Sequence, residues 1–112
     1  MSEGIDVGAL ASFPVGEGRR IYGDTIGIDY DIAICNDEGE LYAVDDTCTH
    51  SLASLSEGWI EECRVECPLH SAEFDLKTGE ALSLPAVKPV RTYRVEVVDG
   101  RVLLFPGQPR PQ

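Results

Sequence analysis

The sequence consists largely of short strand-like runs separated by turn signals, and no other feature limits its fold as strongly. Residues 30–46 (YDIAICNDEGELYAVDD) place two apolar runs on either side of a tight turn signal, with Gly39 the expected left-handed residue. Residues 92–105 (TYRVEVVDGRVLLF) alternate apolar and polar side chains around an Asp-Gly dipeptide. Both segments are therefore predicted to be hairpins.

Two further runs, RRIYG at 19–23 and ECRVEC at 62–67, also have strand composition, and helical periodicity is absent apart from one turn near 51–56. We predict an all-β chain, a small antiparallel β-sandwich or barrel of short strands. The 112 residues fit a single domain, residues 1–112. Only the tail at 106–112 (PGQPRPQ) has a composition typical of disorder.

The charge balance restricts the partners. The chain has 20 Asp and Glu against 9 Lys and Arg, a formal net charge of -11, which argues against nucleic acid and anionic lipid as partners. The acidity serves either solubility or steering toward a basic protein surface. The N-terminal segment MSEGIDVGAL lacks the pattern of a signal peptide, and no apolar run is long enough to span a bilayer. The expected setting is the cytoplasm, with no membrane contact.

Two short segments each combine one cysteine with one histidine. Cys48 and His50 are separated by one residue, and Cys67 and His70 by two, in a chain with only 4 Cys and 2 His. Each pair follows a strand-like run, and Pro68 ends the second run because proline has no N–H to donate to a strand ladder. We expect both pairs on loops that a rigid β base supports, where functional sites are common.

Three kinds of chemistry use Cys and His at such spacing. A structural zinc takes two Cys and two His, although finger-type sites usually place like ligands together. A Cys–His nucleophilic dyad needs only one pair and leaves the other idle. A 2Fe–2S cluster with two Cys on one iron and two His on the other uses both pairs. Analysis of iron, zinc and acid-labile sulfide separates the cluster from zinc.

The pattern Cys-x-His, sixteen residues, Cys-x-x-His resembles the signature of Rieske iron–sulfur proteins. The flanking segments ELYAVDDTCTHSLASLSEG and FDLKTGEALSLPAVKPVRTYRVEVVDGRVLL are similar to those of the Rieske-type ferredoxins in bacterial aromatic-ring dioxygenase systems, and the likeness covers roughly residues 15–105. It implies a Rieske fold with a cluster-binding subdomain at about 45–85. It also implies one 2Fe–2S cluster, and the implied ligands are Cys48, His50, Cys67 and His70.

The resemblance also implies how the cluster is tuned. The respiratory branch of the family has a disulfide between its ligand loops, but the matching positions here are Ala53 and Leu69. That branch also has Ser and Tyr hydroxyls near the cluster sulfurs, where this chain has Ala72 and Phe74. These differences predict a low reduction potential. By the same resemblance, Pro85, in the segment 84–89, is expected to cover the cluster.

The function implied is that of a monomeric electron carrier, not an enzyme. It would take one electron from a flavin-dependent ferredoxin reductase and pass it to a terminal oxygenase. No set of acid, base and nucleophile stands outside the ligands. The alternative is the small subunit of an assimilatory nitrite reductase, which has a similar fold and would copurify with a large subunit.

Several other residues receive predictions. The candidates for the docking face are Leu52, Trp59, Leu69 and Pro85, with a place in the core as the alternative for Trp59. Cys35 is expected to be a buried small hydrophobe and Cys63 an exposed or partly exposed thiol in a turn. The pair Asp45-Asp46 is expected to form a solvated turn.

Overall fold

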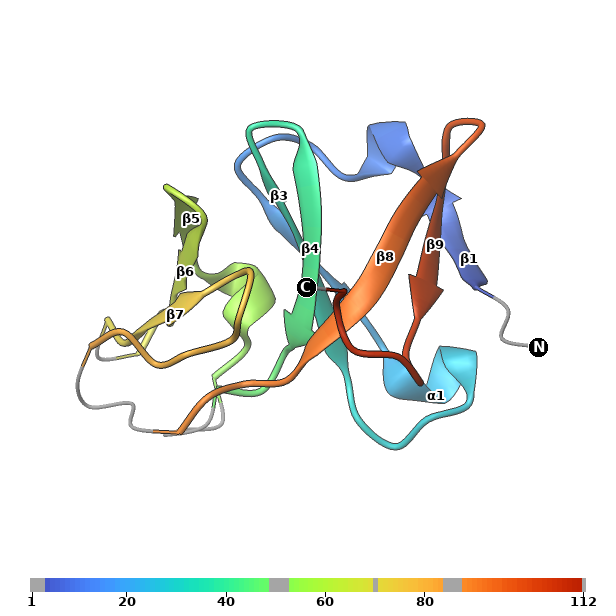
Figure 1. Cartoon of the computed structure of the whole chain (residues 1–112). Coiled ribbons are helices and arrows are strands. Elements are labelled where there is room, and N and C mark those ends of the chain that lie inside the picture. Colours follow the sequence, from blue (N-terminus) through green and yellow to red (C-terminus); the bar gives the residue numbers. More distant parts are fainter. Residues whose placement is uncertain (1–3, 49–52, 70, 84–87, 112) are drawn as a thin grey trace.

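The computed structural model describes residues 4–48, 53–69, 71–83 and 88–111, and most of its regular structure is β-strand (Figure 1). The strands are β1 (Ile5–Ala9), β2 (Gly18–Ile21), β3 (Ile32–Asp37), β4 (Glu40–Asp45), β5 (Trp59–Glu61), β6 (Arg64–Glu66), β7 (Glu73–Asp75), β8 (Thr92–Val98) and β9 (Arg101–Phe105). The helical segments are single turns: η1 (Leu10–Ser12), α1 (Gly23–Ile26) and η2 (Leu55–Glu57). No helix in the described ranges is long and apolar enough to cross a membrane.

The strands form two antiparallel sheets that stand side by side in Figure 1. The larger has six strands in the order β1-β9-β8-β4-β3-β2, and the smaller has three in the order β5-β6-β7. Residues of the first and last strands of the larger sheet, Val7 and Ile21, pack into the same core, so the sheet curves into an open half-barrel. The predicted all-β class and antiparallel architecture are confirmed.

The β3–β4 hairpin is buried on both faces, which explains its continuous apolar sequence. One face contributes to the core inside the six-stranded sheet, which consists of Phe13, Ile21, Ile32, Ile34, Leu41, Ala43, Tyr93, Val102 and Leu104. The other contributes to a second core, here called the junction core, which consists of Ala33, Cys35, Tyr42, Val44, Cys48, Leu55, Val65, Cys67, Ala72, Phe74, Leu76 and Val90. A strand covered on both sides has no polar face and loses the period-two alternation.

The two predicted hairpins have the predicted turns. In the β3–β4 turn, Glu38 and Gly39 have φ values of 55° and 98°, and in the β8–β9 turn Asp99 and Gly100 have 51° and 76°. Two consecutive residues with positive φ are typical of the type I′ turn, whose twist matches that of a hairpin. Glutamate is an unfavourable residue there, because its Cβ crowds the backbone in the left-handed region.

Replacing Glu38 by asparagine should therefore stabilise the protein. The change creates the Asn-Gly dipeptide that type I′ turns prefer, and we expect the free energy of unfolding to rise by about 0.5–1 kcal/mol. Thermal or urea unfolding measures the change. The control is Glu17→Asn, which makes the same substitution at an exposed position outside the positive-φ residues and should have no stabilising effect.

The β5–β6 turn connects the small sheet to the large one. Its residues Glu62 and Cys63 also have positive φ, at 53° and 62°. The Cys63 backbone N–H donates to the Asp37 carboxylate at 3.0 Å, and the Leu76 N–H donates to the Cys63 carbonyl at 2.9 Å. The tip of the small sheet is thus fastened to the end of the β3–β4 hairpin.

The described part of the C-terminal tail contacts β8 and β4. The Arg94 N–H donates to the Gln108 carbonyl at 3.0 Å, and the Arg94 guanidinium donates to the Gln108 side chain at 2.9 Å. The Arg110 guanidinium lies 4.5 Å from the centre of the Tyr42 ring. Residues 106–111 therefore make contacts with distant parts of the chain, although their own composition is typical of disorder.

Candidate functional site

Both cysteines of the Cys–His pairs lie where the sequence predicts, just beyond the ends of strands. Cys48 follows β4 and Cys67 follows β6 directly. Their exposed fractions are 2% and 0%, and both belong to the junction core. The loops after β4 and β6 thus bring two sulfurs from separate parts of the chain into one apolar environment. His50 and His70 lie outside the described residues.

The two loops that carry the pairs close in the same way. The Cys48 N–H donates to the Ala53 carbonyl at 3.0 Å, and the Cys67 N–H donates to the Ala72 carbonyl at 2.6 Å. In each loop the acceptor is the residue five positions after the cysteine. Each loop therefore has an internal bond that fixes the backbone of its cysteine, and each histidine of the sequence falls between the bonded residues.

The residue pairs that flank the loops are also equivalent. Thr47 pairs with Ser54 across an isolated bridge, and Glu66 pairs with Glu73 in the β6–β7 ladder. The first pair encloses residues 48–53 and the second encloses residues 67–72. The site is thus built from two hairpin tips of equal length, each with a cysteine as its first residue.

The donor chemistry of this arrangement fits an iron–sulfur cluster. Leu55, Val65 and Phe74 are fully buried beside the cysteines and exclude water from them. Thiolates are the protein ligands of such clusters, and an apolar, shielded setting is one of the factors that set their potential. Among the described residues, which do not include His50 and His70, no three or more His, Cys, Asp and Glu side chains gather in a metal-binding group. A metal centre bound by the two cysteines would need further ligands from elsewhere in the chain.

Asp46 is a buried residue that supports the first loop. The predicted solvated turn is wrong, because the exposed fraction of Asp46 is 1%. Its carboxylate accepts from the Ser54 hydroxyl at 2.7 Å and from the Ser56 N–H at 2.9 Å, and the Arg20 Nε lies 3.4 Å away. The Leu55 N–H donates to the Asp46 carbonyl at 2.7 Å. Asp46 therefore ties both ends of the first loop to each other and to β2.

Asp45 is likewise structural rather than solvated. Its carboxylate accepts from the Arg91 N–H at 2.8 Å and from the Tyr93 hydroxyl. The Asp45 N–H donates to the Arg91 carbonyl at 3.0 Å. Burial and the hydrogen bond to Asp45 both raise the pKa of Tyr93, so its hydroxyl keeps the proton that it donates. These contacts join the end of β4 to the residue before β8.

The sequence contains only a weak indication that Asp45 and Asp46 are structural residues. They directly follow the apolar residues 41–44, and they precede Cys48 by three and two positions. A serine partner such as Ser54 is recognisable only once the two sides of the loop are known to be paired.

The other two cysteines lie where they were predicted. Cys35 is fully buried on the junction side of β3, and burial, with a smaller contribution from the charge of Asp46, raises the pKa of its thiol to about 12. Cys63 is half-buried at the β5–β6 turn, where it makes a side-chain hydrogen bond with Tyr42.

Alkylation should separate these two thiols. A thiolate is the reactive form, so a buried thiol with a pKa of about 12 stays unreactive at pH 8. We expect iodoacetamide to modify Cys63 and not Cys35 in the native, cluster-loaded protein, and both after denaturation. Peptide mass spectrometry identifies the modified residue, and alkylation of native Cys35 would contradict the packing described here.

The predicted docking residues are described in part. Trp59 on β5 has an exposed fraction of 65%, so its alternative place in the core is wrong, and Leu69 has 50%. Both large apolar side chains face solvent near the two loops. Leu52 and Pro85 lie outside the described residues.

Comparison with known proteins agrees with this geometry. Residues 7–94 match the family model of the Rieske [2Fe-2S] domain. A 3-phenylpropionate/cinnamic acid dioxygenase ferredoxin subunit of Escherichia coli (strain K12) is 47% identical over 103 residues, which is 91% of this chain and 92% of that protein.

Two solved structures give the same fold. A chain in the complex of reduced oxygenase and oxidized ferredoxin in carbazole 1,9a-dioxygenase has a TM-score of 0.83 at 33% identity, with 96% of each chain covered. A putative NADH-dependent nitrite reductase small subunit from Mycobacterium tuberculosis has a TM-score of 0.78 at 23% identity, with 93% of this chain and 95% of that chain covered, and this likeness concerns the fold alone. The protein belongs to the Rieske [2Fe-2S] domain family, and within it resembles the ferredoxins of dioxygenase systems.

Proposed function

We propose that the protein is a one-electron carrier that takes electrons from a flavin-dependent ferredoxin reductase and delivers them to the terminal oxygenase of an aromatic-ring dioxygenase system. The observation that carries the proposal is the pair of equal hairpin tips, each beginning with a buried cysteine. The named relatives support it, since they are ferredoxin subunits, which transfer electrons and do not catalyse the oxygenation. The protein acts in this role as a soluble, cytoplasmic monomer.

The cluster would be held by the four residues of the two pairs. Cys48 and Cys67 would supply thiolates to one iron, and His50 and His70 would supply imidazoles to the other. When bound, the cluster accepts and releases one electron. The segment between β4 and β8, predicted at about 45–85, is the cluster-binding subdomain. Its own residues fix the cysteine backbones, exclude water and support the loops through Asp46.

Analysis of the purified protein tests this proposal. We expect two iron, two acid-labile sulfide and no zinc per chain. The reduced protein should also pass electrons in a single turnover to the oxygenase component of a 3-phenylpropionate/cinnamic acid dioxygenase. One zinc without sulfide would overturn the proposal. Tight copurification with a sirohaem-containing subunit would indicate a nitrite reductase instead. Only the likeness in fold supports that role.

The residues around the cysteines support a low reduction potential. Ala72 and Phe74 are fully buried in the junction core with Cys48 and Cys67, and neither side chain has a donor for a sulfur. Reduction adds negative charge to the cluster, so a hydrogen bond to its sulfurs favours the reduced state. Without these donors, we expect a potential near the low end of the Rieske range, about −150 mV.

Phe74→Tyr should raise that potential by tens of millivolts. A new hydroxyl donating to the Cys48 sulfur would favour the reduced form by roughly 1–1.5 kcal/mol, and about 1.4 kcal/mol corresponds to about 59 mV for one electron. Protein-film voltammetry measures the shift. Phe74→Leu is the control that adds no donor, and a Tyr variant with an intact visible spectrum and the wild-type potential would contradict the expectation.

A further inference from the structure

The outer face of the three-stranded sheet has an unusual combination of side chains. Its inner residues Val65 and Phe74 are fully buried, so the alternate residues of β5, β6 and β7 point outward. By this register the outward residues are Trp59, Glu61, Arg64, Glu66, Glu73 and Asp75. We call the first five of them, which surround one hollow, the Trp59 face. The single tryptophan of the chain thus lies exposed on a sheet among carboxylates.

The register of the sheet puts carboxylates where they repel each other. Glu66 lies directly opposite Glu73 on one side and opposite Trp59 on the other. Like charges at directly opposed positions destabilise an antiparallel pair. Arg64 lies 3.8 Å from the carboxylate of Glu73 and 2.7 Å from that of Glu62. In the described part of the chain, no ion pair involves Glu66 or Glu61.

The five side chains of the Trp59 face surround a shallow hollow of about 30 Å³. That volume accepts a group of the size of a water molecule, and an ammonium group is of similar size. The wall of the hollow consists of an indole ring, which attracts cations, three carboxylates and one guanidinium, that of Arg64. Arg64 pairs with Glu73, so Glu61 and Glu66 leave the wall with an excess of negative charge. Its chemistry therefore matches the end of a lysine or arginine side chain.

The hollow lies next to one of the two hairpin tips that carry the cysteines. Glu66 immediately precedes Cys67, so a protein seated on the Trp59 face would be held next to one of the two hairpin tips. The surrounding segment adds charge of the same sign, because residues 57–66 (EGWIEECRVE) contain four Glu and one Arg. The field of this segment therefore favours a positively charged surface over a neutral one.

From these observations we propose that the Trp59 face is a docking surface for a basic face of a redox partner protein, and that its hollow receives one lysine or arginine side chain of that partner. This rests on the proposed function, since it specifies the chemistry of the carrier's partner. The repulsion between Glu66 and Glu73 is then relieved when the partner's cation arrives. The exposed indole provides the apolar contact that aromatic residues make at interfaces.

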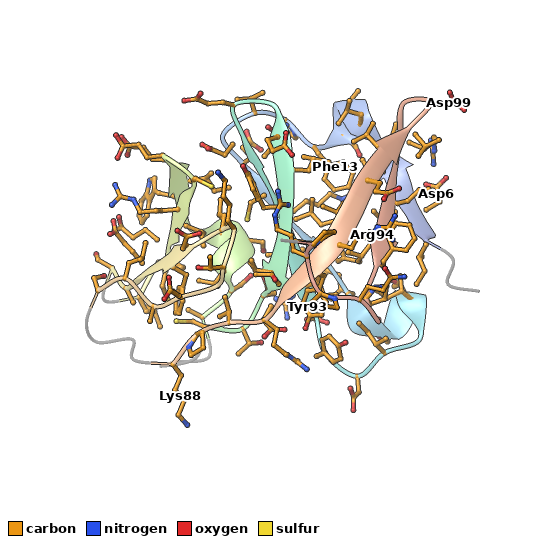
Figure 2. The ribbon with its side chains drawn as sticks, in the orientation of Figure 1. Asp6, Phe13, Lys88, Tyr93, Arg94 and Asp99 are labelled. Carbon is orange, nitrogen blue, oxygen red and sulfur yellow. The ribbon has the colours of Figure 1, made fainter. Side chains whose placement is uncertain are left out.

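The test measures electron transfer from the reduced, cluster-loaded protein to oxidised horse-heart cytochrome c, a basic protein that accepts one electron. Glu61→Gln/Glu66→Gln removes the two unpaired carboxylates. Asp24→Asn/Asp99→Asn removes the same charge from α1 and from the β8–β9 turn, and Figure 2 shows Asp99 at the hairpin tip far from the small sheet. Since net charge is equal in the two double variants, any difference between them is local.

At low ionic strength we expect the first double variant to lower the second-order rate constant about tenfold and the control to lower it less than twofold. Trp59→Ala should lower it about fivefold with no change in net charge. The thermal midpoint of the first double variant should not fall, because the substitution removes the repulsion between Glu66 and Glu73. Loss of docking without loss of stability distinguishes a binding role from a structural one.

Equal slowing in both double variants would overturn the proposal, because total charge alone would then guide the encounter. An unchanged rate in Glu61→Gln/Glu66→Gln or in Trp59→Ala would also overturn it. Ferricyanide, a small anionic acceptor, reports whether the cluster transfers electrons without docking, and its rate should change less than twofold in every variant. A wild-type protein that lacks iron or fails to reduce ferricyanide would refute the proposed function, whereas the outcomes above refute only the docking surface.

Discussion

Cys67→Ala should yield a protein that contains almost no iron and lacks the visible absorption of a 2Fe–2S cluster, yet retains most of its β-structure. The loss follows because the thiolate is a proposed ligand and no other described cysteine lies on that loop. The β-structure survives because the core of the six-stranded sheet contains no residue between Asp46 and Pro89. Iron analysis, visible absorption and far-ultraviolet circular dichroism together measure the result, and Cys48→Ala should behave alike.

Cys63→Ser is the matched control for this experiment. Cys63 is half-buried at the β5–β6 turn, outside the two hairpin tips, so its substitution should leave iron content and spectrum at wild-type values. Two results would contradict the assignment of the ligands. One is a Cys63→Ser protein without a cluster, and the other is a Cys67→Ala protein that retains the wild-type spectrum.

The second large effect is expected at Asp46. Asp46→Ala removes the acceptor of the Ser56 N–H and the Ser54 hydroxyl, and leaves Arg20 without one of its two carboxylate neighbours. Breaking buried, charge-assisted bonds without replacing their partners costs several kcal/mol, and we expect the free energy of unfolding to fall by about 3 kcal/mol. These bonds fix the first hairpin tip, and residues that orient metal ligands affect metal binding. We therefore expect iron content to fall to less than half as well.

Two variants define the cause of that effect. Asp46→Asn keeps an acceptor for the Ser56 N–H and should lose only about half as much stability. Glu57→Ala removes a carboxylate from the exposed surface of η2 and should change neither quantity. Chemical denaturation measures the free energy of unfolding, and iron analysis measures the cluster content of each variant. An Asp46→Ala protein with wild-type iron content would show that the loop is held by its other contacts.

The parts of the fold that depend on local signals could be predicted from the sequence. The β3–β4 and β8–β9 hairpins have tight turns that glycine marks directly, at Gly39 and Gly100. In contrast, β1 has only five residues, with a register shift between Asp6 and Gly8, and it becomes a strand by pairing with β9, from the other end of the chain. The strand β7 has only three residues, and its identity likewise comes from its pairing with β6.

The residues of the site also divide into those that local signals predict and those that depend on distant contacts. The Cys–His pairs were visible because the residue types and their spacing are local properties of the sequence. The burial of Asp46 was not, because the groups that face its carboxylate come from β2 and from the far side of the loop. The place of Trp59 depended on the register of β5 against β6, which puts it opposite Glu66 on the outer face. No pattern within β5 alone fixes that register.

The contacts of Asp45 with Arg91 have a consequence for how such a protein can evolve. They hold together the two points at which the chain leaves the large sheet and returns to it, between neighbouring strands β4 and β8. An insertion whose ends are adjacent costs its host little, because the entropy of closing a loop rises only slowly with its length. The cofactor-bearing segment can therefore be lengthened, shortened or exchanged between lineages while the sheet keeps its own sequence requirements. Redox properties and the stability of the scaffold can thus diverge under separate selection.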